Sequence, residues 1–250
     1  VRDANGEFTV NSSYGAAVAN PIATMTQQIN ETSTTRFLLN GFGEYKIIEG
    51  LTAKVSLGTD IIENKQNRYI PSTLYESPAG GSASKGSLSS LNWLNENTIS
   101  YKKKFGEKHA FDILAGYTQQ KTTSEVFRAG SSNFASDEFT YNNLGSGTVI
   151  TVPAFGATEW SLQSYLTRVN YGFDDRYLFT FTVRADGSSR FGADNKWGTF
   201  PSGAFAWNIS NEKFLKGVEQ ISSLKLRLSA GLTGNQEINP YQSIARLSYY

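Results

Sequence analysis

The sequence predicts an all-β protein, namely an antiparallel transmembrane β-barrel segment of about eight strands. Three observations support this class. Apolar and polar residues alternate strictly over long stretches, which is typical of strands with one apolar face. The apolar rows run for about nine to eleven residues, the length that a tilted strand needs to cross a bilayer, whereas strands average about five or six residues in soluble sheets. Long and short polar connections alternate between these stretches, as they do in outer-membrane barrels.

The alternation is clearest in a predicted hairpin from Tyr165 to Ala185. Its odd positions are Tyr165, Thr167, Val169, Tyr171 and Phe173 in one strand and Tyr177, Phe179, Phe181, Val183 and Ala185 in the other. Its even positions include Arg168, Asn170, Thr180, Thr182 and Arg184. One face is therefore apolar and the other is polar and charged, with a turn at Asp174-Asp175-Arg176. We expect Arg168, Arg184 and Arg227 on the polar side, because a one-residue shift in register would place them in lipid at about 2–4 kcal/mol each.

The rest of the chain predicts further elements of the same kind. Residues 1–35 are rich in Ser, Thr, Asn and Gln, which predicts an exposed loop with a short helix near Ile22 to Ile29. Four strands precede the hairpin, and their expected bounds are Phe37 to Ile47, Leu51 to Ile61, Asn95 to Lys103 and Phe111 to Tyr117. Two strands follow it between Trp197 and Leu232. A compact connection over 210–222, with a short helix at Glu212 to Lys216, joins these last two strands.

The predicted connections differ in length in a regular way. Long polar connections are expected over about 63–94, 121–158 and 186–196, and short turns over 48–50, 104–108 and 173–176. In outer-membrane barrels the long loops face the cell exterior and the short turns face the periplasm. This pattern assigns the three long segments to the extracellular side.

Composition excludes several classes of function. The chain has 250 residues, no cysteine and a net charge of +1, so it has no disulfide framework and no charge pattern that suits nucleic acid. No stretch approaches the roughly 18 apolar residues of a membrane helix. Val1 follows no initiator Met or signal peptide, and Tyr250 lies within an alternating segment. These two ends predict an internal piece of a longer protein.

A series of motifs lies between Glu159 and Arg246. In chain order the main ones are Arg184-Ala185-Asp186-Gly187-Ser188-Ser189-Arg190-Phe191-Gly192, Trp197-Gly198-Thr199-Phe200-Pro201-Ser202, Ala206-Trp207-Asn208-Ile209, Leu224-Lys225-Leu226-Arg227 and Thr233-Gly234-Asn235-Gln236. In this order and spacing the series resembles the barrel of the SusC/RagA family of TonB-linked outer-membrane transporters from Bacteroidetes. The resemblance is dense from about Glu159 to Arg246 and diffuse before it.

The resemblance implies a fold and a function for the whole protein. Residues 1–250 would form part of a TonB-dependent receptor barrel of about twenty-two strands with a plugged lumen, and the plug domain would lie outside this chain. The implied location is the outer membrane, in contact with its lipid. The implied activity is uptake of glycans or peptides, with energy from the TonB-ExbB-ExbD complex through the plug and with a SusD-like surface lipoprotein over the mouth. As an arc with two unpaired edges, the segment is not expected to be stable alone.

The sequence contains no pattern that indicates an enzyme, a cofactor or a metal site. His109 has no second ligand nearby and is interpreted as a solvated turn residue. Asp174 and Asp175 are interpreted as turn residues, because Asp favours tight turns through bonds to its own backbone. Lys102, Lys103 and Lys104 are interpreted as a rim cluster that faces water or headgroups. No substrate-binding residue can be assigned.

Two groups of residues leave a functional alternative open. Asp186-Gly187-Ser188-Ser189, between Arg184 and Arg190, predicts a braced loop in which Gly187 adopts a positive φ and Arg190 pairs with Asp186; contact with a ligand at the barrel mouth is the alternative. The aromatic residues near strand ends fit the girdles at membrane surfaces, and they are Trp197, Trp207, Tyr171 and Tyr177. Trp93, Tyr141 and Trp160 lie in or beside the long loops, where an exposed ring can stack on a sugar.

Two other classes remain as alternatives. One is a soluble β-sandwich that binds carbohydrate, whose apolar face would be buried inside; a lipid-phase probe would then fail to label Phe179 and Phe181. The other is a stand-alone outer-membrane barrel of about eight strands that serves as an adhesin or anchor.

Overall fold

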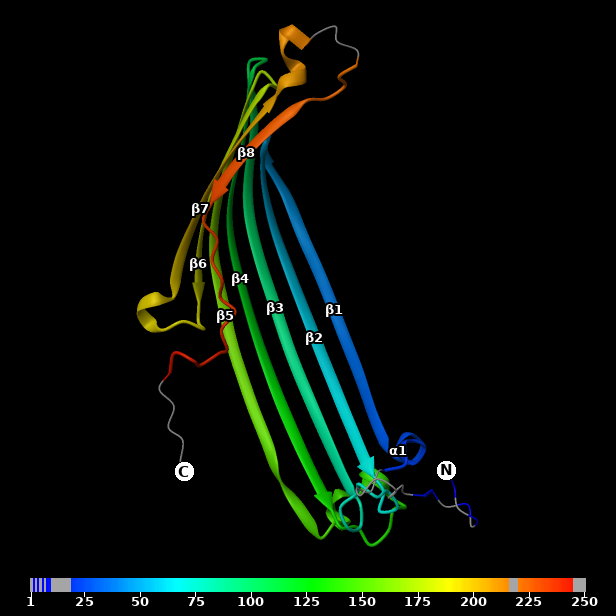
Figure 1. Ribbon diagram of the computed structural model, residues 1–250. Helices are drawn as coiled ribbons and strands as arrows, with labels where there is room; N and C mark the ends of the chain where they lie inside the picture. The colour runs from blue at the N-terminus through cyan, green and yellow to red at the C-terminus, as the bar shows by residue number, and fades with distance from the viewer. Residues whose placement is uncertain are drawn as a thin grey trace. The chain divides into compact units, whose positions relative to one another are not determined.

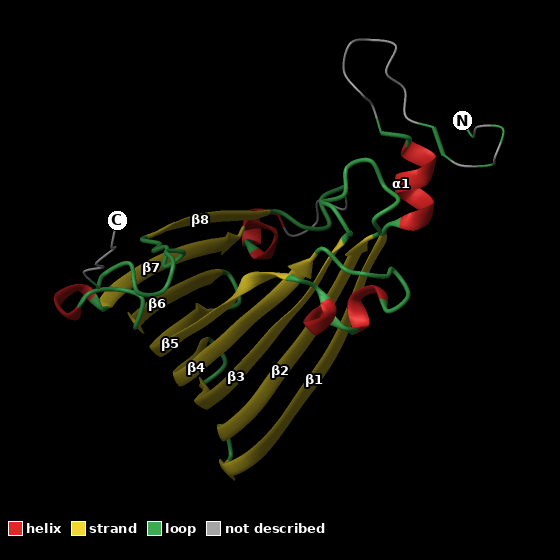
Figure 2. Cartoon of the chain, turned by 90° about the horizontal axis from the view of Figure 1, so that it is seen from below, coloured by secondary structure: helices red, strands yellow, loops and turns green. Residues whose placement is uncertain are grey.

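The computed structural model describes residues 2, 4, 6, 8–9, 19–215 and 220–244 and contains one antiparallel sheet of eight strands (Figure 1). The strands follow one another in sequence order from β1 to β8, and these two strands form the edges (Figure 2). Their bounds are β1 Ile29–Ile48, β2 Leu51–Ile70, β3 Ser82–Phe105, β4 His109–Ser132, β5 Val149–Phe173, β6 Tyr177–Ser188, β7 Trp197–Asn208 and β8 Lys225–Gly231. The predicted fold class is confirmed, and the described sheet does not close into a barrel.

Short helices occupy the connections. The predicted N-terminal helix is α1 (Pro21–Gln27), which begins with Pro21 in its first turn and with the Asn20 side chain accepting a hydrogen bond from the Ile22 N–H at 3.1 Å. The predicted helix at Glu212 to Lys216 is a single 3-10 turn, η5 (Lys213–Leu215), and Lys216 lies outside the described residues. No helix in the described part of the chain is long and apolar enough to cross a membrane.

Two predicted long loops are wrong in extent. Residues 63–70 belong to β2, 82–94 to β3, 121–132 to β4 and 149–158 to β5, so the connections shorten to 71–81 and 133–148. β1 likewise begins at Ile29 and not at Phe37. Apolar and polar residues do not alternate strictly in these added segments: most are largely polar, and 149–158 has apolar residues at both odd and even positions, such as Val149 and Ile150. They therefore carry no clear period-two signal. Hydrogen bonds to the neighbouring strand hold them, such as the one from Asn64 Nδ2 to Thr34 Oγ1 at 3.0 Å.

The chain divides into two compact units. The first comprises Val1–Phe37, Ile61–Leu91 and Thr123–Thr158. Tyr69, Ala83 and Phe134 form its buried core, in which the rings of Tyr69 and Phe134 are 6.2 Å apart. Asp137 closes the unit by accepting hydrogen bonds from the hydroxyl of Tyr69 and from the N–H and hydroxyl of Ser72. Burial alone raises the pKa of Asp137, but these hydrogen bonds outweigh it and hold the pKa below its usual range.

The second unit comprises Leu38–Asp60, Asn92–Thr122 and Glu159–Tyr250. It contains the hairpin β5–β6 together with β7 and β8, whose pairings are all antiparallel. Its large apolar side chains are not covered: Phe181 is 57% exposed and Leu228 is 60% exposed. A β-sandwich would bury such residues under a second sheet, and the described residues contain only the one sheet.

Candidate functional site

The register of β5 to β8 sorts their side chains onto two faces. Val169 pairs with Phe181, and Phe181 pairs with Gly203, so the predicted apolar rows lie side by side. On the opposite face Arg168 pairs with Thr182, and Thr182 pairs with Ser202. The predicted arginines Arg168, Arg184 and Arg227 all lie on this second face, which we call the polar face. The predicted assignment of faces by strand parity is therefore confirmed, with the arginines opposite the apolar rows.

Aromatic rings form two groups on the apolar face. One group is at the turn end, where the ring centroids of Phe111 and Tyr171 are 4.8 Å apart and those of Tyr177 and Trp207 are 6.4 Å apart. The other group joins Tyr117, Tyr165 and Trp197, with centroids 5.2 and 5.9 Å apart. Trp197 and Trp207 are ten residues apart on β7. At roughly 3.3 Å per residue and a tilt of about 40°, this spacing is about 25 Å across a bilayer.

Hydrogen bonds organise the charged part of the polar face. Arg184 Nε donates to Asp186 Oδ1 at 2.6 Å, and its Nη2 donates to the hydroxyl of Ser164 at 3.1 Å. Ser164 is only 1% exposed. Asp186 therefore pairs with Arg184, and the predicted pair with Arg190 is wrong. The reason is that positions 184 and 186 point to the same side of β6, which continues to Ser188.

Three of the sequence motifs meet at one cavity of about 300 Å3. Its lining includes Asp186 and Ser188 from β6, Trp197 and Phe200 from β7, and Asn235 and Gln236 from the following segment. The Phe200 ring requires a glycine in that segment, because a Cβ on Gly234 would lie 2.2 Å from Phe200 Cζ. Gly187 is needed for a similar reason and not for the predicted positive φ: its Cβ would lie 2.7 Å from the Trp197 ring.

Arg190 fastens the segment after β8 to this region. Its Nη1 donates to the carbonyl oxygens of Gln236 and Ile238, each at 3.2 Å, and lies 3.3 Å from Glu237 Oε2. Its guanidinium carbon is 4.4 Å from the centre of the Trp160 ring. The Arg190 side chain is 11% exposed, whereas that of Glu237 is 75% exposed. The carbonyl and ring contacts, and not the ion pair, therefore carry this attachment.

Replacing Arg190 by glutamine is expected to release residues 236–238. The change removes two charge-assisted hydrogen bonds and a cation–π contact, together about 2–4 kcal/mol of local stability. Hydrogen exchange of the intact protein should show faster exchange in this segment. Glu237→Gln is the matched control, because an exposed ion pair contributes about 0–1 kcal/mol. Equal effects of the two substitutions would show that the ion pair makes the attachment.

A buried carboxylate ties the β5–β6 turn to the connection after β7. Glu212, 7% exposed, accepts hydrogen bonds from Arg176 Nη1 at 2.9 Å, from the Tyr177 hydroxyl at 2.7 Å and from Trp207 Nε1 at 3.0 Å. The turn itself has φ values of 54° at Asp174 and 51° at Asp175, as a type I′ hairpin turn requires. The interpretation of these aspartates as turn residues is confirmed. Hydrogen bonds from Tyr177, Trp207 and Arg176 hold the pKa of Glu212 below its usual value.

This carboxylate predicts a pH-dependent contribution to stability. Because the pKa of Glu212 is lowered in the folded state from an ordinary value of about 4.5, its contribution is complete above that pH and is lost as the pH falls through the lower folded value. Glu212→Gln should therefore destabilise the intact protein at pH 7 and make little difference in strong acid. Urea unfolding of both proteins from pH 7 to pH 3 measures the difference. A difference that stays constant with pH would contradict a role for the charge.

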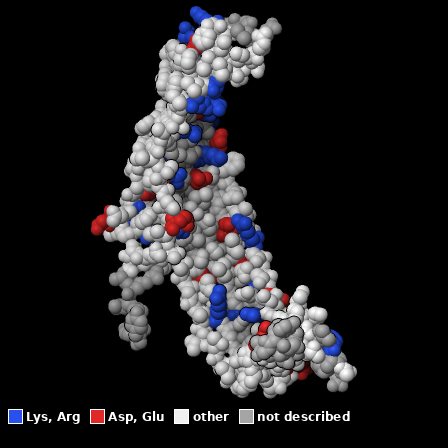
Figure 3. Space-filling model, in the orientation of Figure 1, with Lys and Arg blue, Asp and Glu red and all other residues white. Residues whose placement is uncertain are grey.

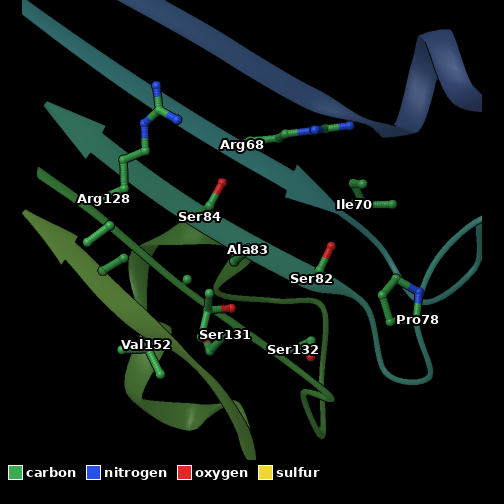
Figure 4. Close-up of a pocket in the computed structure, with 14 residues that line it drawn as sticks. Arg68, Ile70, Pro78, Ser82, Ala83, Ser84, Arg128, Ser131, Ser132 and Val152 are labelled. Atoms are coloured by element: carbon green, nitrogen blue, oxygen red, sulfur yellow. The ribbon is translucent and has the colours of Figure 1, made fainter. Parts of the chain in front are cut away.

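The first unit contains a larger cavity, of about 500 Å3 (Figure 4). Arg68 on β2, Ser84 on β3 and Arg128 on β4 line it, and Figure 4 shows the Ser84 hydroxyl between the two arginine side chains. Arg128 and Ser84 share one face of the sheet: a Cβ on Gly86 would lie 3.5 Å from Arg128 Cγ, and a Cβ on Gly130 would lie 3.5 Å from Ser84 Cβ. This cavity, which we call the arginine pocket, is lined by two arginines, by serine and threonine hydroxyls and by apolar side chains such as Ile70 and Val152.

Comparisons with known proteins agree with this geometry. No family model matches the chain. TonB-dependent receptor P3 of Formosa agariphila is 37% identical over 249 residues, which cover 99% of this chain and 25% of that protein. TonB-dependent receptor SusC of Bacteroides thetaiotaomicron is 34% identical over 221 residues, which cover 88% of this chain and 21% of that protein. The solved RagAB peptide transporter matches with a TM-score of 0.86 at 30% identity, over 94% of this chain and 27% of that chain.

This chain belongs to the SusC/RagA family of TonB-dependent receptors. It spans about a quarter of the length of the curated relatives that it matches. The names of these relatives are those of receptors and a transporter, and none names an enzyme. The motif resemblance stated from the sequence is therefore confirmed at the level of the family.

The remaining residues singled out from the sequence lie at the rim of this SusC/RagA segment or inside its strands. His109 shares a hydrogen bond of 2.9 Å with the Tyr171 hydroxyl, at the turn end of the sheet. Lys102 Nζ lies 3.8 Å from Asp112, and Lys103 lies 5.1 Å from the centre of the Phe105 ring. On the side that Figure 3 shows, basic and acidic side chains are interspersed, with no single block of either sign.

The three loop aromatics are not free stacking platforms in this SusC/RagA segment. Trp93 and Trp160 belong to β3 and β5, and Arg190 covers the Trp160 ring. Tyr141 does lie in a connection, but its hydroxyl donates to Glu31 Oε2 at 2.7 Å and Lys85 lies 5.2 Å from its ring centre. The expected loop position thus holds for Tyr141 alone, and all three residues are of intermediate exposure.

The arginine pocket is the part of the site that sequence reasoning missed. Arg68 falls in the predicted loop 63–94 and Arg128 in the predicted loop 121–158, so neither was assigned to a face. Strand parity cannot be applied to a segment that is taken for a loop. Had 63–70, 82–94 and 121–132 been assigned to strands, the sequence would have shown Arg68 and Arg128 on two strands with a serine-rich strand between them.

Proposed function

We propose that the intact protein carrying this chain is an outer-membrane TonB-dependent transporter that imports nutrients, and that this chain is part of its barrel wall. The apolar face of β5 to β8 contacts lipid, and the polar face lines the lumen of a larger barrel of about twenty-two strands. The observation that carries the proposal is the register, which gathers an apolar band between two aromatic groups about 25 Å apart.

Strand length supports the same function. β3 and β4 have 24 residues each and β5 has 25, whereas a bilayer crossing needs about nine to eleven. Each of these strands thus exceeds one crossing, so part of its length lies beyond the hydrocarbon. The two unpaired edges, β1 and β8, require further strands, because an open edge leaves unpaired backbone groups in lipid.

The relatives support a class of imported molecule and two partners. RagAB is described as a peptide transporter, which favours peptides, and glycans remain the second substrate class. Membership among TonB-dependent receptors supports coupling to TonB-ExbB-ExbD, and likeness to SusC and RagAB supports a SusD-like lipoprotein at the mouth. The connections 71–81, 133–148 and 189–196 are then the extracellular ones, and none of the described residues is assigned to a plug.

Single cysteines in the intact protein test the orientation of the wall. This sequence has no cysteine, so a cysteine introduced at Phe181 or at Thr182 is distinctive within it. A lipid-soluble maleimide should label Phe181→Cys, and a water-soluble one should label Thr182→Cys. Uptake of labelled peptides or oligosaccharides should then depend on an intact TonB complex. Aqueous labelling at both positions, or recovery only in the soluble fraction, would contradict the proposal.

A further inference from the structure

The arginine pocket in the first unit has an unbalanced charge. Arg68 and Arg128 are the charged residues among those that line it, and no Asp or Glu is among them. Arg128 also lines a second cavity of about 290 Å3, whose lining includes Asn64 and Gln66 and again no acidic residue. Arg68 and Arg128 are both exposed residues. The pocket therefore carries two positive charges that its own lining does not neutralise.

The rest of the described chain does not neutralise them either. Among the described residues, neither guanidinium makes a hydrogen bond or an ion pair, in contrast to those of Arg176, Arg184 and Arg190. Two acidic groups of this unit have partners of their own. Asp137 is bonded to Tyr69 and Ser72, and Glu31 accepts the Tyr141 hydroxyl at 2.7 Å. Unpaired cations in a pocket are favourable positions for an anion.

The other polar groups of the pocket suit an oxyanion. Ser82, Ser84 and Ser132 contribute hydroxyl groups that make no hydrogen bond among the described residues, whereas Ser131 donates to the Leu144 carbonyl at 2.6 Å. A guanidinium presents parallel N–H groups that match the two oxygens of a carboxylate or of a sulfate, and a hydroxyl adds a third donor. The lining thus supplies donors of the geometry and charge that an oxyanion accepts.

We propose that the arginine pocket binds an oxyanion on the imported molecule, a carboxylate or a sulfate ester, through Arg68 and Arg128. The proposal rests on the proposed function, since it assigns an acidic substrate to the transporter. The two arginines act as a pair that holds the acidic group while the rest of the substrate moves past the wall. Neutral molecules of the same size gain nothing from the pocket.

Ligand-observed NMR on the purified intact protein tests the proposal with matched probes. For the carboxylate, binding of N-acetylglutamate α-amide is compared with binding of its neutral glutamine analogue. For the sulfate ester, binding of glucose 6-sulfate is compared with binding of glucose. We expect one acidic probe or both to bind and the neutral ones not to bind. Arg68→Gln combined with Arg128→Gln should weaken binding at least tenfold, and Arg128→Lys should weaken it less, because the charge remains without the planar fork.

Arg168→Gln is the control, since it removes one arginine charge from the polar face of the second unit and leaves the pocket intact. Binding of one acidic probe alone identifies which group the pocket takes. Absence of binding by both, or equal weakening in Arg168→Gln and the double variant, would overturn the proposal. Because binding is measured on purified protein, it is independent of the labelling and uptake assays. Failure of the transporter assignment is thus distinguishable from failure of the pocket.

Discussion

Replacing Phe181 by arginine in the intact protein is expected to lower the free energy of unfolding in lipid by about 4–6 kcal/mol. An arginine facing lipid near the bilayer midplane costs about 2–4 kcal/mol, and loss of the lipid-facing phenyl ring costs about 2 kcal/mol more. Phe181 lies near the middle of β6, between the two aromatic groups, and pairs with Val169 and Gly203 on the apolar face. Guanidinium unfolding of the barrel in lipid vesicles measures the loss.

Thr180→Arg is the matched control, because it places the same side chain one residue away on the polar face. Thr180 donates to Asn170 Oδ1 at 2.8 Å, so this variant should cost only about 1 kcal/mol for the lost hydrogen bond. The difference between the two variants then reports which face meets lipid. Similar losses at both positions, or a larger loss at Thr180, would refute the assignment of the apolar face to the membrane.

Replacing Gly50 by alanine is expected to destabilise the first hairpin and its contact with β3 by about 2–5 kcal/mol. Gly50 has a φ of 82°, which costs an L-residue about 1–2 kcal/mol. Its Cβ would lie 2.2 Å from the carbonyl oxygen of Lys102, which is main chain and cannot turn aside. Separating them also strains the hydrogen bond from the Lys102 N–H to the Gly50 carbonyl, now 2.8 Å. Overpacking of this kind adds about 1–3 kcal/mol.

Gly106→Ala separates the two contributions. Gly106 lies in the β3–β4 turn with a φ of 59°, but no heavy atom lies within 4 Å of its Cβ position. The free energy of unfolding of this variant should fall by only about 1 kcal/mol, the cost of placing an L-residue at a positive φ. The Gly50→Ala and Gly106→Ala variants are compared by chemical unfolding and by hydrogen exchange of the amides of residues 48–51 and 101–103. If both substitutions had the same small effect, the close approach of Gly50 to β3 would be wrong.

The membrane-type strands could be predicted because their environment imposes a pattern. In the proposed barrel wall, lipid on one side and polar surroundings on the other impose the strict alternation of Tyr177, Phe179 and Phe181 with Thr180 and Thr182. The tight turn at Asp174 and Asp175 was equally readable, because few residues tolerate a positive φ at two successive positions. The structure has these strands and this turn at the residues predicted for them.

The polar ends of the long strands could not be predicted in the same way. Residues such as Asn64, Gln66 and Arg68 have polar neighbours on both faces, so no apolar row distinguishes a strand from a loop. Their state depends on partners distant in the sequence, as when Asn64 bonds Thr34. The same is true of Arg190, whose partners at 236–238 depend on where the segment after β8 returns.

The sequence alone determined the class of fold, the two faces of β5 to β8 and the family. These could be read because alternation and local motifs are properties of neighbouring residues. Tertiary structure decided how far the strands extend, that Asp186 pairs with Arg184, and that Arg68 and Arg128 line one pocket. Hydrogen bonds between polar strands and pairs of charges join residues far apart in the chain. A pattern of period two carries no information about such partners, and so their positions required the structure.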